Sequence, residues 1–315
     1  MRLLTFMAGP GPRLGVVVGD EVWDANMAVA AHQRAQGHPS PYAAAEASVP
    51  PSLRSFLEGG PAAGRALAVA LAGLPRGGMV QGPWGERVRY PLDGIRFKAP
   101  ILDPQKIIAV GLNYADHAKE GGHPIPEIPM TFAKYNNALL GHREPIVYPR
   151  STQKLDYEVE LAVVIGRRGK YIPRERALDH VGGYTISNDV SARDLQYADK
   201  QIMRGKAGDA FAPMGPFLVT PDEVWDPHTL ALETRVNGEV RQSSNTSQFI
   251  FDVPHLVSFL SQFFTLEPGD VIATGTPPGV GIHRKPPLLL QPGDTVTMTI
   301  ERLGTLENPI VAESA

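Results

Sequence analysis

The 315-residue sequence contains no cysteine, and its charge is almost balanced. The lack of cysteine excludes disulfide bonds, zinc–thiolate sites and cysteine nucleophiles, so carboxylate, imidazole, carbonyl or water ligands would have to hold any metal ion. The chain has 30 lysines and arginines against 33 aspartates and glutamates, which gives a net charge of -3. That balance predicts neither a nucleic-acid partner nor attachment to an acidic membrane surface.

Long apolar runs are also missing. Residues 1–23 have no long apolar core and no small-residue cleavage site, and glycine and proline interrupt them early, unlike a signal peptide. The apolar stretch Ala66–Leu74 is too short to cross a bilayer and is bounded by Arg65 and Pro75. We therefore expect a soluble, cytoplasmic protein with no membrane partner.

Glycine and proline are plentiful instead, with 32 and 30 residues spread along the chain. This distribution predicts many turns between short strands. Within residues 1–99, strand-like runs flank the turn Gly19–Asp20 and spacings typical of short helices follow, which indicates a small mixed N-terminal domain. Residues 100–315 contain further short strands, few helices and a hairpin signal at Asn237–Gly238. Because strands and helices do not alternate regularly, we expect an α+β, β-rich fold, with a mixed β-roll or barrel as the larger domain rather than a doubly wound sheet.

The stretch "LDYEVELAVVIG", residues 155–166, combines a strand-like apolar pattern with three acidic residues. Side chains alternate along a strand, so Asp156, Glu158 and Glu160 would share one face. If these carboxylates are buried together, they need a cation or a proton, and oxygen ligands suit Mg²⁺, Mn²⁺ or Ca²⁺. The commoner meaning of this pattern, a half-exposed strand with an acidic outer face, stays open at this point.

Other candidates each have an ordinary structural alternative. Asp189 follows a β-branched strand and could be a functional carboxylate or the cap of the next helix. His117 and Glu120 are neighbours on one helix face and could form a general-base dyad or a surface pair. Lys206, in a loop of small residues, could polarise a carbonyl or point into solvent. The glycine-rich loop at residues 273–281 offers backbone N–H groups to an anion but lacks the ending of a phosphate-binding loop.

These signals occur in one order, and together they resemble the fumarylacetoacetate hydrolase family, in its acylpyruvase and 2-hydroxyhepta-2,4-diene-1,7-dioate isomerase-like branch. The resemblance covers the chain from about Ile101 to the C-terminus. It rests on the successive blocks "VGLNYADHAKE", "LDYEVELAVVIG", "GYTISNDVSARDLQ", "RGKAGDAFAPMGP", "NGEVRQSSNT", "DVIATGTPPGVG" and "PGDTVTMTIERLGTLENPI". It implies that family's β-rich roll, a homodimer and one divalent cation per subunit, Mg²⁺ or Mn²⁺.

The resemblance also implies roles for individual residues. The metal ligands would be Glu158, Glu160 and Asp189, with Asp156 outside the first coordination shell. The catalytic residues would be His117, Glu120 and Lys206. The substrate contacts would be Arg193, Gln196 and Thr276.

The implied activity is hydrolysis of a carbon–carbon bond in an acylpyruvate or related 2,4-dioxo acid, through an enolate held by the metal, as in the catabolism of aromatic compounds. His117, oriented by Glu120, would take a proton from water, Lys206 would stabilise the oxyanion, and Arg193 would pair with a substrate carboxylate. Two other reactions in the same site remain open, namely decarboxylation of oxaloacetate and isomerisation of a 2-oxo-diene-dioate. A non-catalytic binder of 2-oxo acids is disfavoured by the full set of ligands, dyad and lysine.

Overall fold

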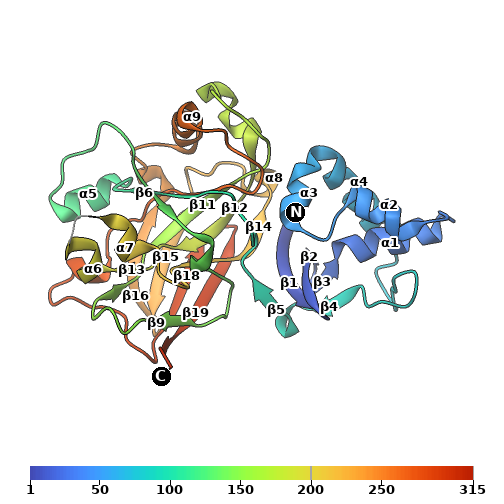
Figure 1. Ribbon diagram of the computed structural model, residues 1–315, viewed down its shortest axis with the longest axis horizontal. Coiled ribbons are helices and arrows are strands. Elements are labelled where there is room, and N and C mark those ends of the chain that lie inside the picture. The colour runs from blue at the N-terminus through green and yellow to red at the C-terminus, as the bar shows by residue number, and fades with distance from the viewer. Residues whose placement is uncertain (199–200, 315) are drawn as a thin grey trace.

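The computed structural model describes residues 1–198 and 201–314. Within these residues the strands form a twelve-stranded sheet, a five-stranded sheet and one two-stranded pair. Figure 1 shows the N-terminal residues, in blue, gathered on one side of the molecule and the rest of the chain on the other. None of the helices in the described ranges combines the length and the apolar character needed to cross a bilayer.

The N-terminal part places four helices beside a set of antiparallel strands (Figure 1). The strands are β1 (Arg2–Ala8), β2 (Gly11–Val18), β3 (Glu21–Asp24), β4 (Arg89–Pro91) and β5 (Arg96–Lys98). The helices are α1 (Ala25–Ala35), α2 (Pro41–Ser48), α3 (Leu53–Glu58) and α4 (Gly60–Gly73). The predicted turn at Gly19–Asp20 joins β2 to β3, and Gly19 has a φ of 65°, which glycine adopts without strain.

The rest of the chain contributes most of the strands and the remaining helices. Its strands are β6 (Ile107–Gly111), β7 (Met130–Lys134), β8 (Leu139–Leu140), β9 (Ile146–Tyr148), β10 (Leu155–Asp156), β11 (Val159–Ile165), β12 (Val181–Asn188), β13 (Ser191–Ala192), β14 (Ala212–Val219), β15 (Ala231–Val236), β16 (Glu239–Asn245), β17 (Val271–Ala273), β18 (Thr295–Ile300) and β19 (Gly304–Ala312). Its helices are α5 (Ala115–Gly121), α6 (Arg193–Ala198), α7 (Ile202–Lys206), α8 (Pro221–Val224) and α9 (Val253–Phe263). The predicted hairpin turn joins β15 to β16, with Asn237 and Gly238 at φ of 51° and 83°, as a two-residue turn of this kind requires.

The fold is α+β and rich in strands, as predicted, but its sheets are open. The largest sheet follows the order β4-β3-β2-β1-β14-β12-β11-β17-β6-β7, with β5 and β8 attached at its side, and in the described residues this path does not close into a barrel. The five-stranded sheet has the order β16-β15-β18-β19-β9. The predicted roll is therefore the better description of the two shapes that the sequence indicated.

One continuous sheet joins the two parts of the molecule. Strand β1 pairs antiparallel with β14, with Leu3 opposite Leu218. Both leucines are fully buried, so this junction belongs to the core rather than to an exposed linker. The division into domains of residues 1–99 and 100–315 consequently stays a prediction.

The strands β11 and β12 lie at the centre of the largest sheet and position the acidic residues. All seven residues of β11 are buried, which explains the near-continuous apolar character of this stretch. The predicted single strand from Leu155 to Gly166 is interrupted, because β10 ends at Asp156 and β11 begins at Val159. Glu158 therefore lies in the break, and its orientation depends on its partners rather than on strand alternation.

Candidate active site

Three carboxylates meet where β11 begins and β12 ends. Glu160 lies on β11, Glu158 precedes this strand and Asp189 directly follows β12. The antiparallel register sets Val159 opposite Asn188, which brings these ends side by side. All three carboxylates are buried, and each offers an oxygen within 4.8 Å of the other two. We call Glu158, Glu160 and Asp189 the carboxylate cradle.

Two cations neutralise Glu158. The Lys206 Nζ donates to Glu158 Oε2 over 2.6 Å and to Asp189 Oδ2 over 2.8 Å, while the Arg193 Nη2 donates to Glu158 Oε1 over 2.6 Å. Burial opposes the ionisation of Glu158, but the charges of Lys206 and Arg193 outweigh it and lower the pKa of Glu158 to about 2. Glu158 is therefore a carboxylate at every pH at which the protein would work.

Glu160 has a different environment. Its Oε2 accepts a hydrogen bond of 3.0 Å from the backbone N–H of Gly275. Burial raises the pKa of Glu160 well above its usual range, and the charges of Asp189 and Glu158 raise it further. A carboxyl in this position needs either a proton or an additional cation.

A count of the formal charges around the cradle also indicates that a proton or an additional cation is needed. The buried carboxylates are Asp156, Glu158, Glu160 and Asp189, and the buried cations paired with them are Lys134, Arg193 and Lys206. Four negative groups against three positive ones leave one negative charge uncompensated when all are ionised. Clustered oxygen ligands with surplus negative charge fit a hard divalent cation, and the cradle could hold one.

Asp156 is not a member of the carboxylate cradle, and its predicted place outside the first coordination shell of a metal stays a prediction. It is fully buried, and its oxygens accept hydrogen bonds of 2.7 Å from Gly281 N, 3.1 Å from Ile282 N and 2.8 Å from Arg193 Nε. These bonds attach the loop that follows β17 to strand β10. Asp156 therefore supports the site through the backbone and through Arg193.

The short helix α5 carries the predicted dyad. The Nδ1 atom of His117 lies 3.1 Å from Glu120 Oε2, and Glu120 Oε1 accepts a 2.9 Å hydrogen bond from Gly279 N. Burial lowers the pKa of His117, although the negative charges of Glu158 and Glu120 oppose this effect. The imidazole is therefore neutral near pH 7, and with Nδ1 donating to Glu120 its Nε2 is available to accept a proton.

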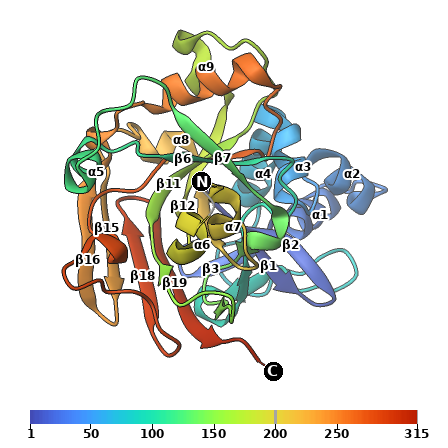
Figure 2. The same ribbon diagram turned by 60° about the vertical axis from the view of Figure 1, so that its left-hand side comes forward.

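The dyad and the cradle line one cavity of about 300 Å³. Its polar lining includes His117, Glu158, Glu160, Asp189, Arg193, Gln196, Lys206 and Thr276. Helices α6 and α7, which carry Arg193, Gln196 and Lys206, lie side by side in front of the central strands (Figure 2). The structure thus brings the predicted catalytic, metal-binding and substrate-binding residues, apart from Glu120, to the wall of a single small cavity. Glu120 does not line this cavity, but its Oε2 lies 3.1 Å from His117 Nδ1.

All three predicted substrate contacts already have protein partners. The Arg193 guanidinium binds Asp156 and Glu158, and its Nη1 donates to Gln196 Oε1 over 3.1 Å. The Thr276 hydroxyl donates to Val159 O over 2.9 Å and accepts from Gln242 over 2.8 Å. Their roles in binding substrate therefore stay predictions, and Arg193 and Thr276 have an evident structural role besides.

Sequence reasoning missed Lys134 and His283. Lys134, the last residue of β7, is buried, and its Nζ donates to Asp189. A signal was available, because Lys134 shares strand parity with Met130 and Phe132, which line the cavity. His283 stacks on the His117 ring with centroids 5.6 Å apart, but it is an isolated residue in a loop and gave no signal in the sequence.

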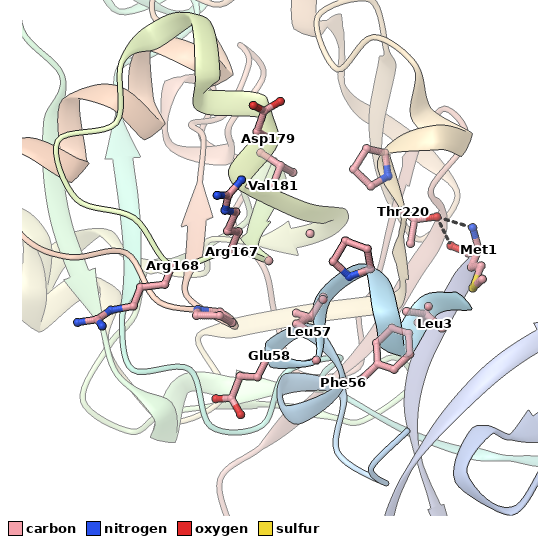
Figure 3. A pocket seen from close by; sticks show the side chains of 18 of the residues that line it. Met1, Leu3, Phe56, Leu57, Glu58, Arg167, Arg168, Asp179, Val181 and Thr220 are labelled. Carbon is pink, nitrogen blue, oxygen red and sulfur yellow. Dashed lines mark hydrogen bonds between the residues drawn. The ribbon is translucent and has the colours of Figure 1, made fainter. Parts of the chain in front are cut away.

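A larger hollow, of about 1030 Å³, lies elsewhere, between the N-terminal part and the rest of the chain (Figure 3). Phe56 and Leu57 line one side, and Arg167, Val181 and Thr220 lie around the other. Of the described residues that line it, none belongs to the cradle, the dyad or the predicted substrate contacts. By volume alone this hollow would be the first candidate for the functional site, but the cradle and His117 line the smaller cavity.

Comparisons with known proteins agree with this geometry. The model of a family described as fumarylacetoacetate (FAA) hydrolase C-terminal matches residues 106–311. The chain is 44% identical over 321 residues to oxaloacetate tautomerase FAHD2A, mitochondrial, of Bos taurus, covering 99% of this chain and 92% of that protein. That relative is named as mitochondrial, so the cytoplasmic location expected for this chain stays a prediction.

Two solved structures are similar over their full length and over all of this chain. One is 5-carboxymethyl-2-hydroxymuconate delta-isomerase from Mycobacterium smegmatis, with 37% identity, a TM-score of 0.73 and 100% of both chains covered. The other is maleylpyruvate hydrolase from Sphingobium sp. SYK-6 in complex with manganese (II) ion and pyruvate, with 31% identity, a TM-score of 0.76 and 100% of both chains covered. The similar proteins are thus named for three reactions: tautomerisation, isomerisation and hydrolysis.

Proposed function

Because this chain belongs to the fumarylacetoacetate hydrolase family, we propose that it is a divalent-metal-dependent enzyme that interconverts the keto and enol forms of a small 2-oxo acid, with oxaloacetate as the first candidate. The observation that carries the proposal is the neutral imidazole of His117 in the same cavity as the carboxylate cradle. Enolisation needs a base beside a 2-oxo group and a means of stabilising negative oxygen.

The cradle residues would hold the cation, Mg²⁺ or Mn²⁺. When bound, this cation supplies positive charge that withdraws electrons from the 2-oxo group and makes the neighbouring carbon more acidic. Lys206 uses hydrogen bonds to Glu158 and Asp189 to fix its ammonium group at the cavity wall. An ammonium group has three donors, so one remains for the oxygen on which negative charge develops.

His117 would move the proton. Its Nε2 accepts the proton from the carbon next to the 2-oxo group, and the electron pair of that C–H bond forms the carbon–carbon double bond while the carbonyl oxygen gains the negative charge. The imidazolium then returns the proton to that oxygen, which completes the enol and restores neutral His117. Glu120 stabilises the imidazolium through its 3.1 Å contact with Nδ1. No carbon–carbon bond breaks and no water is consumed.

The size of the cavity and the identity of a relative favour this reaction. A volume of about 300 Å³ lies at the lower end of ligand pockets, which span roughly 300–1,000 Å³. The 44% identical bovine relative is named as an oxaloacetate tautomerase, and the match covers 99% of this chain. Both points support a small 2-oxo dicarboxylic acid as the substrate.

Hydrolysis of an acylpyruvate is the second candidate. The same neutral His117 that could accept a proton from carbon could accept one from water, and a similar structure is that of a maleylpyruvate hydrolase. Decarboxylation of oxaloacetate and isomerisation of a 2-oxo-diene-dioate use the same groups. The homodimer also belongs to the proposal, and light scattering of the purified protein tests it.

One assay separates these reactions. Oxaloacetate is supplied as its enol with Mg²⁺ or Mn²⁺, the loss of enol absorbance is followed, and the products are identified by NMR. Faster ketonisation than in buffer, with oxaloacetate conserved, supports the tautomerase. Release of pyruvate indicates decarboxylation, and a parallel panel of acylpyruvates that yields pyruvate and a second acid indicates hydrolysis. Unaccelerated ketonisation with either metal would rule out the leading candidate.

A further inference from the structure

A second group of metal-binding side chains lies beside the carboxylate cradle and shares none of its members. His117 and Glu120 come from α5, and His283 comes from the short 3₁₀ turn Gly281–His283. Each residue offers one ligand atom, and these atoms all lie within 4.8 Å of one another. The Glu120 Oε2 lies 3.1 Å from His117 Nδ1 and 3.5 Å from His283 Nδ1.

We propose that His117, Glu120 and His283 form a binding site for Zn²⁺ and that zinc bound there inhibits the enzyme. Two imidazoles and one carboxylate are a typical zinc ligand set, whereas Mg²⁺ prefers oxygen ligands alone. Zinc–ligand bonds of about 2.0–2.1 Å at a tetrahedral angle place two ligand atoms about 3.3 Å apart. The separations of 3.1 Å and 3.5 Å between Glu120 Oε2 and the two Nδ1 atoms lie on either side of this value.

The three ligands are held in place by groups other than a metal. The backbone N–H of Gly279 binds Glu120 Oε1 over 2.9 Å, which leaves Oε2 facing both imidazoles. The rings of His117 and His283 stack at 25° to each other. Such outer contacts orient metal ligands before the ion arrives.

His283 has no other evident use for its Nδ1 atom. That atom is buried and has no hydrogen-bond partner among the described residues, because its 3.5 Å contact with Glu120 lacks hydrogen-bond geometry. A buried polar atom without a hydrogen bond is costly. Coordination to zinc would give this nitrogen a partner. Zn²⁺ bound by one carboxylate and two neutral imidazoles would leave the loaded site with a single positive charge.

The expected inhibition follows from the chemistry of one imidazole ring. In the free protein, His117 Nδ1 carries the proton that is shared with Glu120, and Nε2 can accept another. Zinc binds through the lone pair of Nδ1, so the single ring proton must move from Nδ1 to Nε2. With its proton on Nε2, the neutral ring can no longer act as a base at that atom. This half of the inference rests on the proposed role of His117, whereas zinc binding itself does not.

Calorimetry with the intact protein tests the binding. Zn²⁺ is titrated in the presence of excess Mg²⁺ into the wild type, into His283→Phe, which keeps a ring to stack on His117, and into His38→Phe, which alters an exposed histidine. Loss of a direct ligand should weaken binding by more than the roughly 10- to 100-fold that outer contacts contribute. We therefore expect tight binding to the wild type and to His38→Phe and a loss of more than 100-fold in His283→Phe. Equal zinc affinity in all three proteins would overturn the site.

Two further measurements keep the result interpretable. Unchanged Mg²⁺ affinity of His283→Phe shows that this variant is folded; if it is not, His283→Asn replaces it under the same criterion. Each protein is then assayed with and without zinc and compared with its own zinc-free rate. Zinc should inhibit the wild type, reversibly on chelation, and spare His283→Phe. Binding without inhibition would refute the inhibition and the base role of His117 together, whereas absence of binding would refute the site and leave the proposed function intact.

Discussion

Lys134 and Asp189 form an ion pair that joins the end of β7 to the end of β12, with both side chains about 1% exposed. Asp189 also receives the 2.8 Å hydrogen bond from Lys206 on its other oxygen. Burial lowers the pKa of Lys134, and the charge of Asp189 opposes this effect. The pair therefore orients Asp189 within the cradle, and it is stable only while both partners remain.

Replacing Lys134 by Met should destabilise the protein, because it leaves one oxygen of Asp189 buried without a cation. Removal of one partner of a buried pair costs about 3–5 kcal/mol, and we expect the lower end since Lys206 remains. Urea unfolding of the metal-free protein measures this loss. Arg176→Met is the control, because its pair with Asp179 is largely exposed and should contribute less than about 1 kcal/mol. Similar losses in both variants would contradict the structural role of Lys134.

The affinity for Mg²⁺ should increase with pH because of Glu160. Burial and the charges of Asp189 and Glu158 raise its pKa in the metal-free protein, so the carboxyl keeps its proton to a higher pH than usual, and the cation must displace it. Below that pKa the affinity should rise by about tenfold per pH unit. Calorimetry in buffers with different protonation enthalpies should detect the released proton.

Glu160→Gln is the matched control for this experiment, since it cannot release a proton and should bind Mg²⁺ weakly at every pH.

The raised pKa of Glu160 also affects the stability of the metal-free protein. The stability that protonated Glu160 contributes is present at low pH and is lost as the pH rises through its folded-state pKa. A Mg²⁺ affinity that is independent of pH in the wild type would contradict the assignment of Glu160 as the protonated ligand.

Replacing His117 by Asn should remove the base while leaving the cradle intact. General-base groups contribute typically about 10²–10⁴-fold, so we expect the kcat/KM to fall within that range while Mg²⁺ binding stays within a few-fold. Lys119→Ala, an exposed position on the same helix, should retain its activity. An active His117→Asn variant would assign the proton transfer to another residue.

Arg193→Lys separates a structural role from contact with substrate. Arg193 binds Asp156 through Nε and Glu158 through Nη2, and a lysine cannot reproduce this fork. If the role is structural, unfolding in urea should occur at lower concentration and Mg²⁺ affinity should fall, with KM changed little at saturating metal. Unchanged stability with a tenfold higher KM would instead support pairing with a substrate carboxylate. Arg168→Lys, at a mostly exposed ion pair, is the control.

Local patterns in the sequence were enough to predict many elements of the fold. The turns at Gly19–Asp20 and Asn237–Gly238 lie between strands as predicted, because glycine and asparagine adopt the required backbone conformations at little cost. The pattern after Leu155 correctly predicted strand structure. It predicted one continuous strand, however, whereas the structure has two strands with a break at Tyr157–Glu158. Periodicity cannot reveal such an interruption, because it reports which residues are apolar and not which backbone groups find partners.

The sequence by itself determined which chemistry was possible: without cysteine the site had to use carboxylates, imidazoles and amines, and ordered motifs placed Glu158, Glu160 and Asp189 among them. Only the tertiary structure decided how their charges are compensated. The contacts of Lys134 with Asp189 and of Glu120 with Gly279 join positions 55 and 159 residues apart. Burial makes these contacts necessary, because charges and polar atoms that are removed from water are stable only with partners. Those partners come from distant parts of the chain, so only the whole fold can supply them.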